Sequence, residues 1–170
     1  MNTLECIKNR RSIRRFAQRQ VERVLVEQLI ESARWAPSYN NAKVARFTAL
    51  DDPKIIKEKV AGLMASENRA IVANAPLLLA VSVVKGRSGR RCDGSFETNK
   101  QDAWEMFDAG AACQTLALSA AELGLGSIIM ATFDEAAMAG FFQIPAEEMI
   151  IVVMAVGWPA APPNLPDVKK

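Results

Sequence analysis

The stretch from Leu77 to Val84, which reads LLLAVSVV, decides the fold. Every position in it except Ser82 is apolar, whereas a strand with one face in water alternates apolar and polar residues. A continuous apolar run of this length is typical of a strand at the centre of a sheet. Even with the two residues before it, the run is far shorter than the roughly 20 residues of a membrane-spanning helix. We therefore expect a buried central strand here.

The segments before this strand predict helices around one further strand. Helical spacing of apolar residues and the stop at Pro37 indicate a long second helix. A cap by Asp52 with proline at the next position predicts the start of a third. The expected elements are a helix over 3–10 capped by Thr3, a helix over 21–36, a strand over 44–50, and a helix from Pro53 with Ile56, Val60, Leu63 and Met64 on one stripe.

The segments after the central strand predict one irregular segment, two helices and two strands. We expect an irregular, lid-like segment at about 85–102, a helix over 104–123 closed by Gly124, a strand at 128–131, a helix from Phe133-Asp134 to Phe142, and a last strand over 150–156. Helices and strands are mixed without strict alternation. We therefore predict an α+β fold with a mostly antiparallel central sheet flanked by helices, in a single domain over residues 1–170.

Composition and charge narrow the function classes. The net charge of +2 is too small to predict nucleic-acid binding by the whole chain. Charged residues such as Glu5 and Lys8 interrupt any apolar run at the N-terminus, so we expect a cytoplasmic protein without a membrane segment. The chain has three widely separated cysteines and no histidine, which excludes zinc sites, Ser-His-Asp triads and Cys-His nucleophiles. We expect no metal, and if the protein is an enzyme we expect a bound organic cofactor to supply the chemistry while the protein supplies position and electrostatics.

A cluster of arginines at the N-terminus indicates a phosphate ligand. Residues 10–16 read RRSIRRF, which places four guanidinium groups and a hydroxyl within seven residues. Arginine is always charged and offers a rigid fork of donors that matches phosphate oxygens. The alternative is a solvated basic turn that follows a helix. Both interpretations are open at this point.

Four ordered pieces of the chain resemble the nitroreductase family of flavoproteins. The resemblance covers nearly the whole chain, although no single piece is specific. The pieces are RRSIRRF at 10–16; APSYNN at 36–41; DAGAACQ at 108–114 with GLGS at 124–127; and FD at 133–134 with FQIP at 142–145 and VGWP at 156–159.

The resemblance implies an intertwined homodimer with FMN in the subunit interface. It also implies hydride transfer from NADH or NADPH, through the flavin, to a small acceptor such as a nitroaromatic or a quinone in a ping-pong reaction. The implied flavin contacts are Arg10, Arg11 and Ser12 at the phosphate and ribityl chain, Arg14 at the N1/C2 edge of the ring, Pro37, Ser38 and Asn41 from the partner subunit, and the backbone of Met130, Ala131 and Thr132 near N5. A fixed cation at Arg14 would stabilise the negative charge of the reduced flavin.

The chain departs from the family pattern in three places. Lys43-Val44-Ala45 replace the usual Gln-Pro-Trp, Thr132 replaces a glycine, and Asn164 to Lys170 replace a longer basic tail. Arg15, Lys169 and Lys170 are alternatives for the missing basic contact to the flavin phosphate.

Two further interpretations concern side chains outside this pattern. We expect Trp104 and Phe107 to lie in the core rather than against a substrate. The basic residues at 85–91 favour the phosphates of NADPH over nucleic acid, because Phe96 is the one aromatic residue near them. A flavin-binding protein without turnover remains the alternative function, and a nucleic-acid-binding module is a weaker one.

Overall fold

The centre of the fold is an antiparallel sheet. The computed structural model describes residues 2–162, and their strands pair in the order β1-β2-β4-β3. The strands are β1 (Ala45–Leu50), β2 (Leu77–Val84), β3 (Gly126–Met130) and β4 (Glu148–Gly157). Every neighbouring pair is antiparallel. The predicted α+β fold is confirmed, and β2 has the bounds expected from the sequence.

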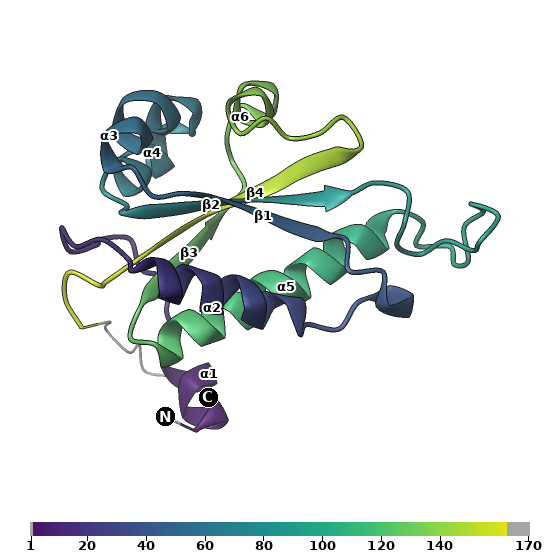
Figure 1. Cartoon of the computed structure of the whole chain (residues 1–170), viewed down its shortest axis with the longest axis horizontal. Coiled ribbons are helices and arrows are strands. Elements are labelled where there is room, and N and C mark those ends of the chain that lie inside the picture. The colour runs from purple at the N-terminus through teal and green to yellow at the C-terminus, as the bar shows by residue number, and fades with distance from the viewer. Residues whose placement is uncertain (1, 163–170) are drawn as a thin grey trace.

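Strand β2 is buried because helices cover both faces of the sheet. Leu78 and Ala80 belong to the core on one face, and Leu77, Leu79 and Val81 belong to the core on the other. Figure 1 shows α3 (Pro53–Ile55), α4 (Ser66–Ala73) and α6 (Glu135–Phe141) on the first face. The long helix α5 (Ala103–Glu122) and α2 (Arg23–Arg34) lie on the second face. Two-sided burial explains why the alternation expected of a half-exposed strand is missing here.

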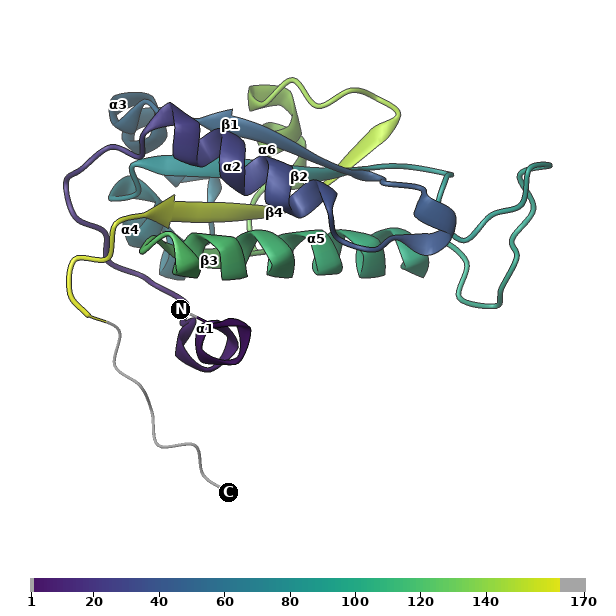
Figure 2. The same ribbon diagram turned by 60° about the horizontal axis from the view of Figure 1, so that its bottom comes forward.

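The first helix lies apart from the sheet and packs on α5. Helix α1 (Thr3–Asn9) is drawn below the body of the molecule in Figure 2. The Cys6 thiol donates to the Leu118 carbonyl of α5 at 3.1 Å. The helix cap is Asn2 rather than the predicted Thr3, because the Asn2 side chain accepts from the Glu5 amide while the Glu5 carboxylate accepts from the Asn2 amide. This reciprocal pair satisfies two backbone donors that a threonine at position 3 would leave open.

The helix expected from Pro53 to Met64 is irregular. Asp52 caps α3 as predicted, but a wide turn, η2 (Ile56–Val60), and a tight turn, η3 (Ala61–Leu63), follow it. Ile56, Val60 and Met64 are all buried in one core cluster. The segment ends there because Met64 becomes extended and pairs with Phe133 in an isolated bridge. A regular helix would have rotated these buried side chains gradually away from the core.

The segment 85–102 contains no helix or strand, as the sequence predicted. Gly86, Gly89 and Gly94 have positive φ angles, which let the chain turn back on itself. A methyl group on Gly89 would lie 2.6 Å from the Trp104 ring, so the segment packs directly on the start of α5. Its backbone is also tied to α5, because the Glu105 carboxylate accepts from the Gly86 amide at 2.6 Å.

Candidate functional site

The arginine-rich segment runs beside the start of β3. Ser12 forms a parallel bridge with Ser127, and the Ile13 amide donates to the Ser127 carbonyl at 3.0 Å. The approach is close because Gly126 has no side chain: a methyl group there would lie 2.4 Å from Ile13. Phe16 is buried, which fixes the far end of the segment in the core. The glycine-rich turn after α5 and the arginine segment therefore lie side by side and are joined by backbone pairing.

Two of the arginines, Arg10 and Arg11, line a small cavity, whereas Ser12, Arg14 and Arg15 do not. It has a volume of about 190 Å³, and its walls include Arg10, Arg11, Ile13 and residues 124–127. The Arg11 Nη1 donates to the Lys8 and Arg10 carbonyls at the end of α1, at 2.6 and 2.7 Å. Its Nε is buried and has no hydrogen-bond partner among residues 2–162. The Arg11 guanidinium is thus held in place by two carbonyls and keeps one buried donor unpaired, which fits an anionic oxygen ligand such as a phosphate.

Met130, Ala131 and Thr132 lie at the opposite end of β3. Met130 is buried, whereas Ala131 and Thr132 are exposed. The Thr132 carbonyl accepts from the Ala65 amide at 3.0 Å, so this backbone is held by the helical layer above the sheet. At about 3.3 Å per residue, the step from Ser127 to Ala131 is about 13 Å. The arginine segment and residues 130–132 thus lie along one edge strand.

Pro37, Ser38 and Asn41 lie in a turn that leads into β1. Asn40, Asn41 and Lys43 have φ angles of 45°, 55° and 45°, which non-glycine residues seldom adopt. Two contacts hold this backbone: the Ser38 hydroxyl accepts from the Lys43 amide at 2.9 Å, and the Asp108 carboxylate accepts from the Tyr39 amide at 3.0 Å. Strained backbone of this kind persists where the surroundings over-determine it, and it concentrates at functional sites.

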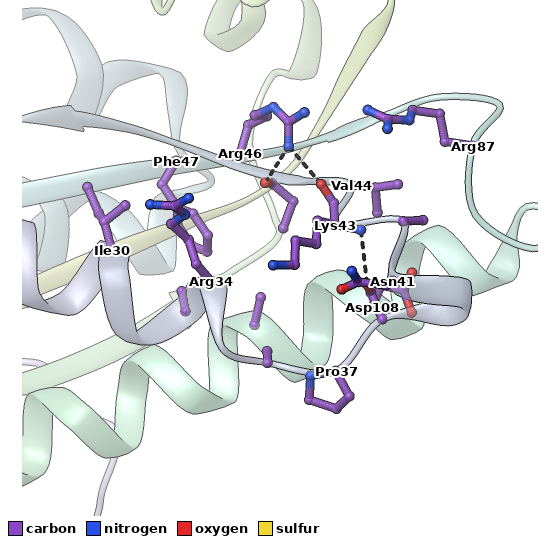
Figure 3. Close-up of a pocket in the computed structure, with 16 residues that line it drawn as sticks. Ile30, Arg34, Pro37, Asn41, Lys43, Val44, Arg46, Phe47, Arg87 and Asp108 are labelled. Atoms are coloured by element: carbon purple, nitrogen blue, oxygen red, sulfur yellow. Dashed lines mark hydrogen bonds between the residues drawn. The ribbon is translucent and has the colours of Figure 1, made fainter.

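This turn forms one wall of a larger pocket, shown in Figure 3. The pocket has a volume of about 560 Å³ and lies between α2, β1 and α5. Pro37, Ser38 and Asn41 line it, and so do the four cationic side chains of Arg34, Lys43, Arg46 and Arg87. None of the other predicted flavin contacts, at 10–14 and 130–132, belongs to its lining.

The arginine segment at 10–14 and the turn at 37–41 lie at diagonally opposite corners of the sheet. Strands β1 and β3 are the two edges, and three steps of about 4.8 Å place them about 14 Å apart. The 37–41 turn precedes Ala45, which pairs with Val83, whereas Ser127 pairs with the same residue of β4 as Leu77 does. Six residues of β2 add about 20 Å along the strand. One chain does not bring these two groups together.

Sequence reasoning missed the basic pocket as a unit. Its cations come from a helix end, a turn, a strand and a loop, and no spacing along the chain connects these segments. The left-handed backbone at Lys43 also has no signature in the residue type. Of the predicted basic loop, Arg87 does line the pocket, but Arg90 is paired with Asp102 at 2.7 Å and lies over the Phe96 ring.

Trp104 and Phe107, both expected in the core, differ in their exposure. Trp104 is half-buried and packs on Tyr39, with ring centroids 4.7 Å apart, but Phe107 is 67% exposed. The prediction that Phe107 lies in the core is therefore wrong, because it lies on the outer face of α5. Lys169 and Lys170 lie outside the described residues. Within residues 2–162, no helix has the length and apolar character needed to cross a membrane.

Comparison with known proteins identifies the family. A model of the nitroreductase family matches residues 7–158. A protein of Methanothermobacter thermautotrophicus, provisionally named NADH dehydrogenase/NAD(P)H nitroreductase, is 29% identical over 98% of this chain and 82% of its own length.

Solved structures share the fold. A nitroreductase family protein of Streptococcus pneumoniae superimposes with a TM-score of 0.82 at 20% identity, covering 99% of this chain and 96% of that one. An FMN-dependent nitroreductase of Clostridium difficile does so with a TM-score of 0.79 at 21% identity, covering 97% and 92%. The family match extends from α1 to the end of β4, over both groups of site residues, and so the chain is an oxidoreductase that belongs to the nitroreductase family.

Proposed function

We propose that the protein is a homodimeric, FMN-dependent oxidoreductase that passes a hydride from NADH or NADPH to a small organic acceptor. FMN, when bound, supplies the group that accepts and then donates the hydride. The acceptor class is a nitroaromatic or a quinone, and the two substrates use the site in turn. The name of the Methanothermobacter relative and the FMN dependence of the Clostridium difficile nitroreductase support this proposal.

The outer edge of β3, with the cavity at its beginning, is the proposed flavin site. Arg10, Arg11 and Ser12 would bind the phosphate and ribityl chain at its beginning, and the backbone of residues 130–132 would face the ring at its end. Arg14 is exposed, and its Nη1 lies 3.4 Å from the Ser12 carbonyl, so its guanidinium is available to a ligand beside the segment. The length of about 13 Å along β3 suits an extended ligand with an anion at one end.

The separation of the two groups of residues is the observation that supports a shared site. Pro37, Ser38 and Asn41 lie at the far corner of the sheet, so their proposed contact with the flavin requires a second copy of the chain. In a symmetric pair, each turn at 37–41 would complete the flavin site along β3 of the partner. Each chain would then contribute to both flavin sites.

Exposed apolar residues support the same pairing. Trp35 at the end of α2 is 81% exposed and Phe107 on α5 is 67% exposed. Gly110 lies one turn further along α5, is also exposed, and has nothing within 4 Å of the position of a methyl group. Trp35 lies beside a later part of α5, in a pocket with Ser119 and Leu123. Exposed large apolar side chains of this kind are typical of a contact between subunits.

The residues of the chain need supply no acid or base in this reaction. The described site offers cations and backbone groups, whose part is to bind, to orient and to stabilise negative charge. This chemistry agrees with a sequence that lacks histidine.

The first test is the visible absorption spectrum of the purified protein before and after anaerobic addition of NADPH. We expect flavin bands that bleach on addition and return with an electron acceptor. Bound flavin that NADPH and NADH both fail to reduce would support a binding protein without turnover. A colourless protein that does not take up added FMN would contradict the proposal.

A second test addresses the residues. We expect Arg10→Ala or Ser12→Ala to weaken FMN binding by about 1.5–3 kcal/mol, the range for a hydrogen bond to a charged group. Mixing Arg10→Ala subunits with Asn41→Ala subunits should restore activity to about a quarter of the sites, because each mixed dimer has one intact site. No recovery on mixing, with dimers exchanging, would place both residues in the same chain's site.

A further inference from the structure

The pocket in Figure 3 has an excess of positive charge. Four cationic side chains line it against one carboxylate, that of Asp108. Asp108 is buried, and it already accepts from the Tyr39 amide at 3.0 Å and from the Ser88 hydroxyl at 2.7 Å. It is therefore occupied by backbone and hydroxyl donors and does not pair with the cations.

Two of the four cations have no partner in the described part of the chain. Arg34 pairs with Glu31 at 2.8 Å, and Arg46 donates to the Lys43 and Ala45 carbonyls. The charged groups of Lys43 and Arg87, by contrast, have neither an ion pair nor a hydrogen bond within residues 2–162. Like charges gathered around a concave surface raise the local concentration of anions.

The backbone at Lys43 is strained, and its side chain points into the pocket. Its φ of 45° is held by the hydrogen bond from its amide to the Ser38 hydroxyl. Figure 3 shows the Lys43 side chain running into the space between α2 and the 37–41 turn. Left-handed backbone at a lysine costs free energy that a glycine or asparagine would largely avoid.

We propose that this basic pocket binds the phosphates of the nicotinamide dinucleotide, with Lys43 and Arg87 as the main contacts from different parts of its wall. The inference rests on the proposed function, because it identifies where the hydride donor would be held. The turn that lines the pocket also contains Ser38 and Asn41, the proposed contacts to the flavin of the partner site. A donor whose nicotinamide lies against that flavin would therefore lie next to this wall, within which its phosphates meet the cations.

Size and charge both agree with a nucleotide phosphate. A volume of about 560 Å³ is within the range of small-molecule sites and exceeds what a lone ion requires. Arg87, Arg90 and Arg91 all belong to the 85–102 segment. The guanidinium groups of Arg90 and Arg91 donate hydrogen bonds to other residues of that segment, whereas that of Arg87 does not. Phosphate recognition is thus assigned to Arg87 together with Lys43, and not to the whole basic loop.

The test compares Lys43→Gln, Arg87→Gln and the double variant with Arg23→Gln as a matched control. Arg23 lies on α2, is exposed, and pairs with Glu27 away from the pocket. Steady-state rates with NADPH, NADH and one neutral acceptor would be measured at constant ionic strength. Binding of adenosine 2′,5′-bisphosphate, followed by calorimetry, adds a measurement that involves no hydride transfer.

We expect the double variant to raise the KM for NADPH by about tenfold or more, with an unchanged KM for the acceptor. A matching loss of affinity for adenosine 2′,5′-bisphosphate, together with an unchanged KM for NADH, would identify the 2′-phosphate as the group that the pocket binds. An equal rise for NADH would identify the pyrophosphate. The Arg23→Gln control should change none of these values by more than about twofold.

Other results would overturn the inference. One is a double variant whose KM values for NADPH and NADH equal those of the Arg23→Gln control, and another is a change in the KM for the acceptor alone. A third is loss of bound FMN from the double variant, which would assign the pocket to the flavin. If the wild-type protein lacked NAD(P)H oxidation altogether, the proposed function would fail. The pocket would still be tested, because bisphosphate binding that depends on Lys43 and Arg87 does not require turnover.

Discussion

Asp108 is the residue whose replacement tests the architecture of the site most directly. Its carboxylate joins three segments: it lies on α5, accepts from the Tyr39 amide in the 37–41 turn, and accepts from the Ser88 hydroxyl in the 85–102 segment. The side chain of Asp108 is 3% exposed and Ser88 is fully buried. Replacing Asp108 with alanine removes both bonds and leaves the Ser88 hydroxyl without an acceptor.

The expected loss of stability follows from these two bonds. A hydrogen bond to a charged group contributes about 1.5–3 kcal/mol, but the Tyr39 amide lies in a half-exposed turn where water can replace the carboxylate. We therefore expect Asp108→Ala to lower the free energy of unfolding by about 2–4 kcal/mol. Asp108→Asn should lose only about 1 kcal/mol, because its amide oxygen can accept from Tyr39 while its NH2 group donates to the rotated Ser88 hydroxyl.

The assay is urea unfolding of the flavin-free protein, followed by circular dichroism, for Asp108→Ala, Asp108→Asn, Ser88→Ala and the Asp108→Ala/Ser88→Ala pair. Removing the flavin separates stability from cofactor binding. We expect the double variant to lose at least about 1 kcal/mol less than the sum of the single variants. The control is Asp93→Ala, whose exposed carboxylate also accepts two bonds, both from Ser95, and whose loss should be smaller. Equal losses for Asp108→Ala and Asp108→Asn, or additive losses in the pair, would refute this reasoning.

Three further outcomes are expected. Gly126→Ala should lower FMN affinity and cost about 1–3 kcal/mol of stability, because its methyl group meets Ile13 at 2.4 Å, whereas Gly140→Ala in α6, with nothing within 4 Å, should not weaken FMN binding; equal FMN affinities would contradict this. A thiol reagent at pH 8 should modify exposed Cys92 first, because burial raises the pKa of the Cys113 thiol to about 11; rapid reaction at Cys113 would disprove its burial. The native Cys113 thiol keeps a proton that the unfolded chain releases near pH 9.0, so its contribution to the free energy of unfolding is complete below that pH. The free energy of unfolding should therefore fall by about 1 kcal/mol between pH 8 and pH 10 because of this thiol. Cys113→Ala should lack this fall.

The sheet and its helices could be predicted from the sequence because their signals are local. A continuous apolar run located β2, and a stretch of small residues closed by Gly124 located α5. Asp52 and Asp134 cap helices where proline or polar residues indicated a start. The irregular turns between Pro53 and Met64 could not be predicted, because Met64 pairs with Phe133, a residue far away in the sequence. Phe107 was misplaced for a related reason: its spacing fits a buried helical face, but only the three-dimensional packing determines which face of α5 meets the sheet.

The site divides in the same way. Motif order indicated the arginine segment and the 37–41 turn, and those residues do lie at defined corners of the sheet. Their assignment to the flavin stays a prediction. The basic pocket could not be predicted, because Arg34, Lys43 and Arg87 are far apart in sequence and become neighbours only through the packing of α2, β1 and the 85–102 segment.

The distance between the two corners has a consequence for how such a protein would respond to dilution. If a flavin site needs one corner from each of two chains, cofactor binding and association of the chains are thermodynamically linked. Apparent flavin affinity would then rise with protein concentration, and added flavin would hold pairs together. The spacing of two edge strands, set by the order β1-β2-β4-β3, would thereby make protein abundance a control on how much of the cofactor is retained.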